Sequence, residues 1–258
     1  MDFVDIRERA SGDPCRDIDW PRTLTSNKMH LRLREQERSI PVHIALDVSN
    51  SMLMSGDVPK RDAALEIIDV LVHSALRKTC EITFMLFSDG IEWIRRSVSD
   101  MRAYERARVE ILGWQAGEHT MTDVKGVLQT LSWELRLPTL VFVISDFLSA
   151  FEWEEDFERL LGRHEVIPIV LEDPRDSRGP VGFAYCQGIE SRRTRLAFAG
   201  GSDEFVRMRL FFDHLVSEAR TVWARMQINE SSESRLECLA EMFRAFGEQI
   251  SMRMVSRR

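Results

Sequence analysis

The chain of 258 residues is long enough for one large α/β domain or two small ones. Its 35 basic and 42 acidic residues are interspersed, and the formal net charge of −7 provides no broad basic surface for nucleic acid or anionic membranes. The four cysteines lie far apart without CxxC spacing, which argues against a zinc ribbon and a dense disulfide framework.

The beginning of the chain, MDFVDIRERASGD, has no apolar core of the kind found in signal peptides. No later stretch approaches the roughly 20 apolar residues that span a bilayer. We therefore expect a soluble, cytoplasmic protein with no membrane insertion. In the following segment, GDPCRDIDW, Gly12 and Asp13 suit a turn, while Ile18 and Trp20 suit packing against a sheet. A structural brace is favoured there over a partner-binding surface.

Four short apolar runs rich in β-branched residues predict buried strands. Their nearly continuous hydrophobicity indicates that helices cover both faces of a mostly parallel sheet. The runs are IPVHIALDV (40–48), EITFMLFS (81–88), TLVFVISD (139–146) and HEVIPIVLED (164–173). Segments with apolar residues at helical spacing predict helices at 60–78, 100–114, 122–135 and 151–163. The Asp-Gly turn in FSDGIEWIRRS (87–97) predicts a hairpin-like edge strand.

The last third of the chain is less regular. Segment 173–201 is rich in turn residues and predicts two short strands, and two amphipathic helices are expected near 204–226 and 234–247. We find no internal repeat and no low-complexity linker. The chain is therefore divided into an N-terminal extension (1–38), an α/β core (39–174) and a C-terminal elaboration of short strands and two helices packed on the core (175–258).

Three oxygen-bearing side chains follow the first predicted strand of the core without a break. Asp47, Ser49 and Ser51 occupy alternate positions in DVSNSM, and alternate side chains of an extended backbone point the same way. They can therefore converge on one hard cation. The competing interpretation is an Asx or serine turn that caps a helix.

Two more oxygen-bearing positions are expected at the same edge of the sheet. Thr122 opens a predicted helix, Asp146 ends a buried strand, and open α/β sheets bind ligands just beyond the carboxyl ends of their strands. The combined set has only two formal negative charges and only oxygen donors, which suits Mg²⁺ or Mn²⁺. The predicted metal ligands are Asp47, Ser49, Ser51, Thr122 and Asp146.

The motif series DVSNS, TD and ISD resembles the metal-ion-dependent adhesion site of von Willebrand factor A domains. The upstream segment RERASGDPCRDIDWPRTLTSNK resembles the pattern of the bacterial domain of unknown function 58 family, a von Willebrand A-like group, and with ISD and DPRD this resemblance covers most of the chain. It implies a Rossmann-like, doubly wound, mostly parallel sheet with helices on both faces. Many members of that family carry N-terminal membrane helices, whereas this chain begins almost at the motif.

The resemblance also implies a function and partners. Members are commonly encoded beside MoxR-type AAA+ ATPases, and the pair is thought to act in chaperone-like maturation or assembly of other complexes, including metalloenzymes such as methanol dehydrogenase. We therefore expect a metal-dependent protein-binding adaptor whose ion accepts an Asp or Glu carboxylate of a client protein. The chain has no GxSxG, HExxH, GxxxxGK[ST] or strand-linked GxGxxG motif, so we expect no enzymatic activity and assign any ATP hydrolysis to the partner.

Three points stay open from the sequence. A metal-dependent phosphoester hydrolase using Asp47 and Asp146 is the alternative function. Thr120 competes with Thr122 as the threonine ligand, and we prefer Thr122 because TDVKGVL starts an apolar helix. Lys60 is interpreted, like the arginine that follows it, as an ordinary residue at the start of a helix.

Overall fold

The structure is a computed structural model, and it describes residues 3–8, 20–26, 28–34, 40–53, 59–115, 122–148, 153–174, 183–187, 194–198 and 203–256. The chain divides into two compact units, residues 1–39 and 40–258. In the smaller unit, β1 (Phe3–Glu8) pairs antiparallel with β2 (His30–Arg34), and α1 (Trp20–Ser26) lies between them in the sequence. The predicted packing of the Ile18 and Trp20 side chains falls outside the described part of the chain.

The larger unit is built on a six-stranded sheet with the order β10-β7-β6-β3-β4-β5. All neighbouring strands are parallel except β5, which runs antiparallel to β4 at one edge. This arrangement confirms the four predicted core strands, the hairpin-like edge strand and the Rossmann-like, von Willebrand A type of fold. The strands are β3 (Val42–Asp47), β4 (Ile82–Phe87), β5 (Ile91–Val98), β6 (Leu140–Ser145), β7 (Glu165–Glu172) and β10 (Ala224–Gln227).

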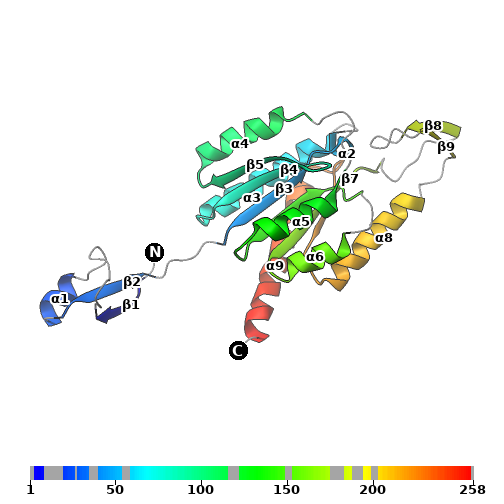
Figure 1. Cartoon of the computed structure of the whole chain (residues 1–258). Helices are drawn as coiled ribbons and strands as arrows, with labels where there is room; N and C mark the ends of the chain where they lie inside the picture. The colour runs from blue at the N-terminus through cyan, green and yellow to red at the C-terminus, as the bar shows by residue number, and fades with distance from the viewer. Residues whose placement is uncertain are drawn as a thin grey trace. The chain divides into compact units, whose positions relative to one another are not determined.

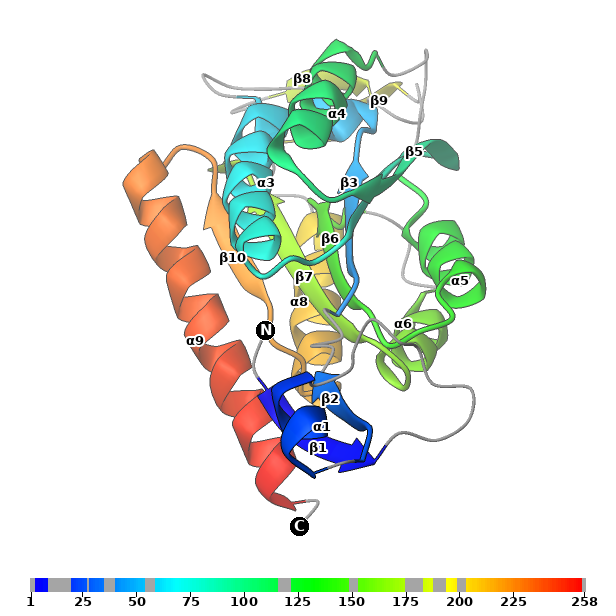
Figure 2. The ribbon, with the colours of Figure 1, turned by 90° about the vertical axis from the view of Figure 1, so that its left-hand side faces the viewer.

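Helices cover both faces of this sheet, as the continuous hydrophobicity of its strands requires (Figures 1 and 2). The helices that contribute to one hydrophobic cluster are α3 (Lys60–Arg77), α4 (Met101–Gly113) and α9 (Ser232–Ser256). Those that contribute to the other are α5 (Val124–Glu134), α6 (Glu154–Leu161) and α8 (Asp203–Glu218). The sheet therefore forms the middle of three layers.

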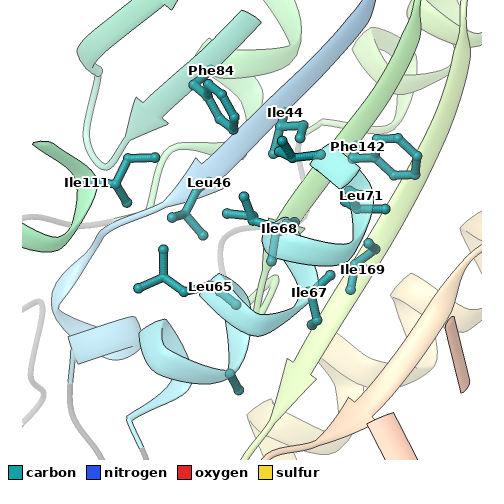
Figure 3. Close-up of a cluster of buried hydrophobic side chains, with 14 of the residues drawn as sticks. Ile44, Leu46, Leu65, Ile67, Ile68, Leu71, Phe84, Ile111, Phe142 and Ile169 are labelled. Atoms are coloured by element: carbon teal, nitrogen blue, oxygen red, sulfur yellow. The ribbon is translucent and has the colours of Figure 1, made fainter. Parts of the chain in front are cut away.

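Strand β3 shows how the residue pattern builds the two cores. Successive side chains of a strand point to opposite faces, so Ile44 and Leu46 join the cluster under α3 while Ala45 joins the opposite cluster. Figure 3 shows Ile44 near Leu71 and Leu46 near Ile68, two residues of α3. Because both faces of β3 are buried, its carboxyl end is held firmly in place.

The C-terminal part differs from the sequence-based expectation in one respect. A helix was expected over 204–226, but α8 ends at Glu218 and residues Ala224–Gln227 form β10, which pairs in parallel with β7. Burial in β10 alternates, with Ala224 and Met226 inside, which is the period of a strand. The C-terminal segment thus completes the central sheet instead of only packing on it.

Two further predictions concern the C-terminal strands and the membrane. The backbone of β8 (Phe183–Gln187) pairs antiparallel with β9 (Thr194–Phe198), in agreement with the two short strands expected there. In the part of the chain that the structure describes, no helix has both the length and the apolar composition needed to cross a bilayer.

Candidate metal centre

The candidate site lies where the direction of chain progression across the sheet reverses. From β3 the chain continues to β4 and β5 on one side, and it later returns to the other side of β3 as β6. Leu46 pairs with Ile144, so Asp47 and Ser145 follow at adjacent strand ends. Ligands of open α/β sheets bind in the crevice at such a switch point. The structure therefore brings the acidic end of β3 to the acidic end of β6.

Three hydroxyl groups gather at this point. The Oγ atoms of Ser49 and Ser51 are 3.1 Å apart, and Thr122 Oγ1 donates a hydrogen bond to Ser49 Oγ over 2.9 Å. Ser49 and Thr122 are buried, whereas Ser51, in the short helix α2 (Asn50–Leu53), is partly exposed. Three of the five predicted ligands thus form one contiguous cluster that reaches the surface at Ser51.

Asp47 is completely buried and is held by two hydrogen bonds. Its Oδ1 accepts the backbone N–H of Ser49 over 2.8 Å, and its Oδ2 accepts the hydroxyl of Ser145 over 2.6 Å. Burial and then the negative charge of Asp146 raise the pKa of Asp47 to about 7, although the hydrogen bonds from Ser145 and Ser49 act in the opposite direction. A cation at this site would favour the charged form of Asp47.

Asp146 is also completely buried, and it has a counter-ion that the sequence did not reveal. Lys60 Nζ donates to Asp146 Oδ2 over 2.8 Å, and the side chains of the pair are 1% and 0% exposed. The interpretation of Lys60 as an ordinary helix-start residue was therefore wrong. Two signals were available: Lys60 lies on the same helical face as the buried residues Ala64 and Ile67, and a cation in the first turn of a helix opposes the helix dipole.

A tight turn after β6 fixes the carboxylate of Asp146. The N–H of Leu148 donates to Asp146 Oδ1 over 3.1 Å, and the N–H of Phe147 donates to Ser145 Oγ over 2.9 Å. Phe147 has a φ of 52°, in the left-handed region that a bulky residue rarely adopts. Its ring packs against Trp153 and Phe212, with centroids 5.9 and 4.9 Å apart. Aromatic packing therefore holds the turn that orients Asp146.

Arg209 of α8 is a second buried cation at this edge that the sequence did not single out. Its Nη1 donates to the backbone carbonyl of Asp146 over 2.8 Å, and its Nε lies 2.8 Å from Glu172 Oε1 at the end of β7. Glu172 also lies 3.3 Å from Arg225 Nε. Arg209 therefore ties the end of β6 to that of β7 through a carboxylate that contacts two cations. No local sequence pattern marks Arg209, because its partners lie on other elements.

The segment around Thr122 is positioned by the start of α5. The side chain of Asp123 accepts the N–H of Gly126 over 2.9 Å and so caps the helix. The N–H of Asp123 donates to the carbonyl of Ser88, at the end of β4, over 2.7 Å. Thr120, the competing candidate, lies outside the described residues.

The donor set fits Mg²⁺ or Mn²⁺. Ligands at about 2.1 Å in an octahedron are separated by about 3.0 Å along each edge, which matches the 2.9 and 3.1 Å separations of the three hydroxyl oxygens. Hard oxygen donors and a nearby carboxylate are the ligands that these ions prefer. Among the described residues, no three His, Cys, Asp or Glu side chains gather to hold a metal, so the candidate depends on the hydroxyl groups.

Comparison with known proteins places the chain in a family. The model of a family described as "Protein of unknown function DUF58" matches residues 5–218. An uncharacterized protein of Mycobacterium tuberculosis is 26% identical over 193 residues, which cover 70% of this chain and 58% of that protein. An uncharacterized protein of Mycobacterium bovis matches to the same extent. The chain thus spans little more than half the length of these relatives.

Solved structures share the fold. The conserved hypothetical protein BatB of Bacteroides thetaiotaomicron aligns over 80% of this chain and 99% of its own, with 15% identity and a TM-score of 0.50. An aerotolerance-related membrane protein of Bacteroides fragilis, solved with multiple mutations to serines, aligns over the same shares with 13% identity and a TM-score of 0.54. At this level of identity the likeness concerns the fold alone.

Proposed function

Because this chain belongs to the DUF58 family, whose description names no activity, we propose its function from the chemistry of the site: it is a metal-dependent protein-binding adaptor. The ion is Mg²⁺ or Mn²⁺, held by Asp47, Ser49, Ser51, Thr122 and Asp146 in a metal-ion-dependent adhesion site. The observation that carries the proposal is the cluster of three hydroxyl oxygens at octahedral edge distances beside two buried carboxylates.

The exposure of the ligand set supports a role in binding. Asp47, Ser49 and Asp146 have no solvent-exposed surface, while Ser51 is partly exposed. An ion bound by these buried ligands would have its remaining coordination position on the solvent side, near Ser51, where a group from another molecule could bind. A carboxylate suits this position because it is a hard oxygen donor whose charge complements the cation.

The proposed partners are a MoxR-type AAA+ ATPase and a client protein that supplies an Asp or Glu side chain. The sequence contains no phosphate-binding GxxxxGK[ST] loop, so ATP hydrolysis is assigned to the ATPase. The adaptor would connect the ATPase to the client during chaperone-like maturation or assembly of a protein complex, for example a metalloenzyme such as methanol dehydrogenase.

The test is affinity capture from the native cell with Mg²⁺ or with chelator. We expect the ATPase or client to be retained with Mg²⁺, lost in chelator and recovered when Mg²⁺ is restored. Ser51→Ala should weaken capture because it removes the partly exposed hydroxyl of the cluster. Ser132→Ala is the matched control, since the Ser132 hydroxyl donates a hydrogen bond to the carbonyl of Leu128 within α5, away from the site. Capture that is indifferent to chelator and to Ser51→Ala would refute the proposal.

A further inference from the structure

We propose that Lys60 makes the binding of the metal and the binding of a partner carboxylate cooperative, an inference that rests on the proposed function. The buried ammonium group would oppose occupation of the site by a cation alone, and it would favour occupation by the cation together with an anion. Lys60 would thus act as a positioning and charge-balancing residue that makes the adaptor respond to a carboxylate.

The ion pair of Lys60 and Asp146 is the structural basis. Its 2.8 Å contact joins two side chains with 1% and 0% exposure, so neither charge is screened by water. Lys60 is fixed at the first position of α3, and the helix around it is anchored by buried Ala63, Ala64 and Ile67. The ammonium group is therefore held in the interior beside Asp146.

The charges of the site explain the expected coupling. Asp47, Asp146 and Lys60 together carry one net negative charge when both carboxylates are ionised. A divalent cation would convert this to one net positive charge in a buried setting, which is unfavourable. A single carboxylate from outside would neutralise that excess. Without Lys60, the cation and the two aspartates would already be neutral, and an added carboxylate would gain little.

Thermodynamic linkage turns this balance into a measurable quantity. If a carboxylate strengthens metal binding, the metal must strengthen carboxylate binding by the same factor. Couplings between sites in proteins commonly amount to about 5- to 150-fold in affinity. We expect roughly a tenfold effect here, because the two ligands would occupy adjacent positions.

The experiment measures Mn²⁺ affinity by the paramagnetic resonance signal of free Mn²⁺, in potassium acetate and in potassium chloride at equal ionic strength. For the native chain, affinity should be roughly tenfold higher in acetate. For Lys60→Met, affinity should already be higher than native in chloride and should change little with acetate. Complexation of Mn²⁺ by acetate in solution is the same for both proteins and cancels in the comparison.

Two variants separate charge from packing. Lys125→Met removes a cation from an exposed position three residues after Thr122, and it should leave the acetate effect at the native level. Lys60→Arg keeps a cation beside Asp146 while it changes the size and shape of the side chain. This variant should retain the acetate effect, and it gives a comparison of equal charge if Lys60→Met alone unfolds.

The outcomes distinguish the inference from the proposed function. Equal Mn²⁺ affinity and equal acetate effects in the native chain and Lys60→Met would overturn the role of Lys60 and leave the metal site standing. Absence of Mn²⁺ binding from the native chain and every variant would overturn both. If Mn²⁺ bound to Lys60→Met but not to the native chain, the result would show that Lys60 opposes the cation. It would also contradict a metal-dependent function of the native chain.

Discussion

The hydroxyl of Ser145, at the end of β6, donates a hydrogen bond over 2.6 Å to Oδ2 of Asp47, at the end of β3. This bond joins the two strands on either side of the switch point, although the residues are 98 positions apart in the sequence. The bond stabilises the charged form of Asp47, but burial and the negative charge of Asp146 outweigh it and raise the pKa of Asp47. The electrostatic properties of the site can therefore be tested through Asp47 itself.

We predict that Asp47→Asn has opposite effects on stability with and without metal. In chelator at pH 8, the variant should be more stable than the native chain, because ionised Asp47 is buried beside Asp146 and its pKa is raised to about 7. A raised carboxyl pKa means that this destabilisation is present above pH 7 and is relieved as the pH falls toward 3.8. With saturating Mg²⁺, the native chain should gain stability and the variant should not.

Thermal unfolding followed by circular dichroism measures this difference. The amide of asparagine retains one oxygen that can accept the N–H of Ser49, so the local backbone should be preserved. Equal responses of the two proteins to Mg²⁺ would show that Asp47 does not bind the ion.

A second prediction concerns the cap of α5, which places Thr122. A Cβ at Gly126 would lie 2.2 Å from Asp123 Oδ2, so Gly126→Ala should displace the capping side chain. Loss of an N-cap costs about 1 kcal/mol, which cancels the similar gain from replacing glycine by alanine in a helix. We therefore expect no net stabilisation from this substitution.

Gly247→Ala in α9 provides the matched control, because a Cβ there would meet nothing within 4 Å. This substitution should stabilise the chain by about 1 kcal/mol. Denaturant unfolding of the native chain and the two variants measures these changes in the free energy of unfolding. A similar gain at both positions would show that the Asp123 cap tolerates the methyl group.

The sequence predicts the features of this structure that depend on local residue patterns, and it misses those that depend on contacts between distant residues. The apolar runs of β3 and β6 predicted buried strands of a mostly parallel sheet, which places Asp47 and Asp146 at the same edge. That the two strands are neighbours is known from the structure. The ion pair of Lys60 and Asp146 was missed, because local signals could mark Lys60 as buried but could not identify a partner 86 positions away. Strand β10 was missed because its alternation lasts for only four residues after a longer helical pattern.

His43 on β3 provides a prediction of pH dependence. Burial, and then the positive charge of Arg96, lower the pKa of His43 from 6.5 to about 4. The unfolded chain therefore binds a proton at His43 below pH 6.5 that the folded chain takes up only near pH 4. By linkage, the folded state should lose roughly 3 kcal/mol from this residue as the pH falls through that window.

The comparison with His43→Gln isolates this contribution. Asp47 acts with the opposite sign over an overlapping pH range, but it is present in both proteins and cancels in their difference. The free energy of unfolding of the native chain, relative to the variant, should decrease between pH 7 and pH 4. Parallel stability curves would contradict the lowered pKa of His43.

The last prediction separates the adaptor from a metal-dependent phosphoester hydrolase. We expect the purified chain with Mg²⁺ or Mn²⁺ to show no turnover of p-nitrophenyl phosphate. Hydrolysis requires a group that activates the attacking water, whereas both carboxylates here already accept hydrogen bonds from the protein. Asp47 accepts hydrogen bonds from the N–H of Ser49 and the hydroxyl of Ser145. Asp146 accepts hydrogen bonds from Lys60 Nζ and the N–H of Leu148. Metal-dependent turnover that disappears in Asp47→Asn, together with partner capture that survives chelator, would favour the hydrolase.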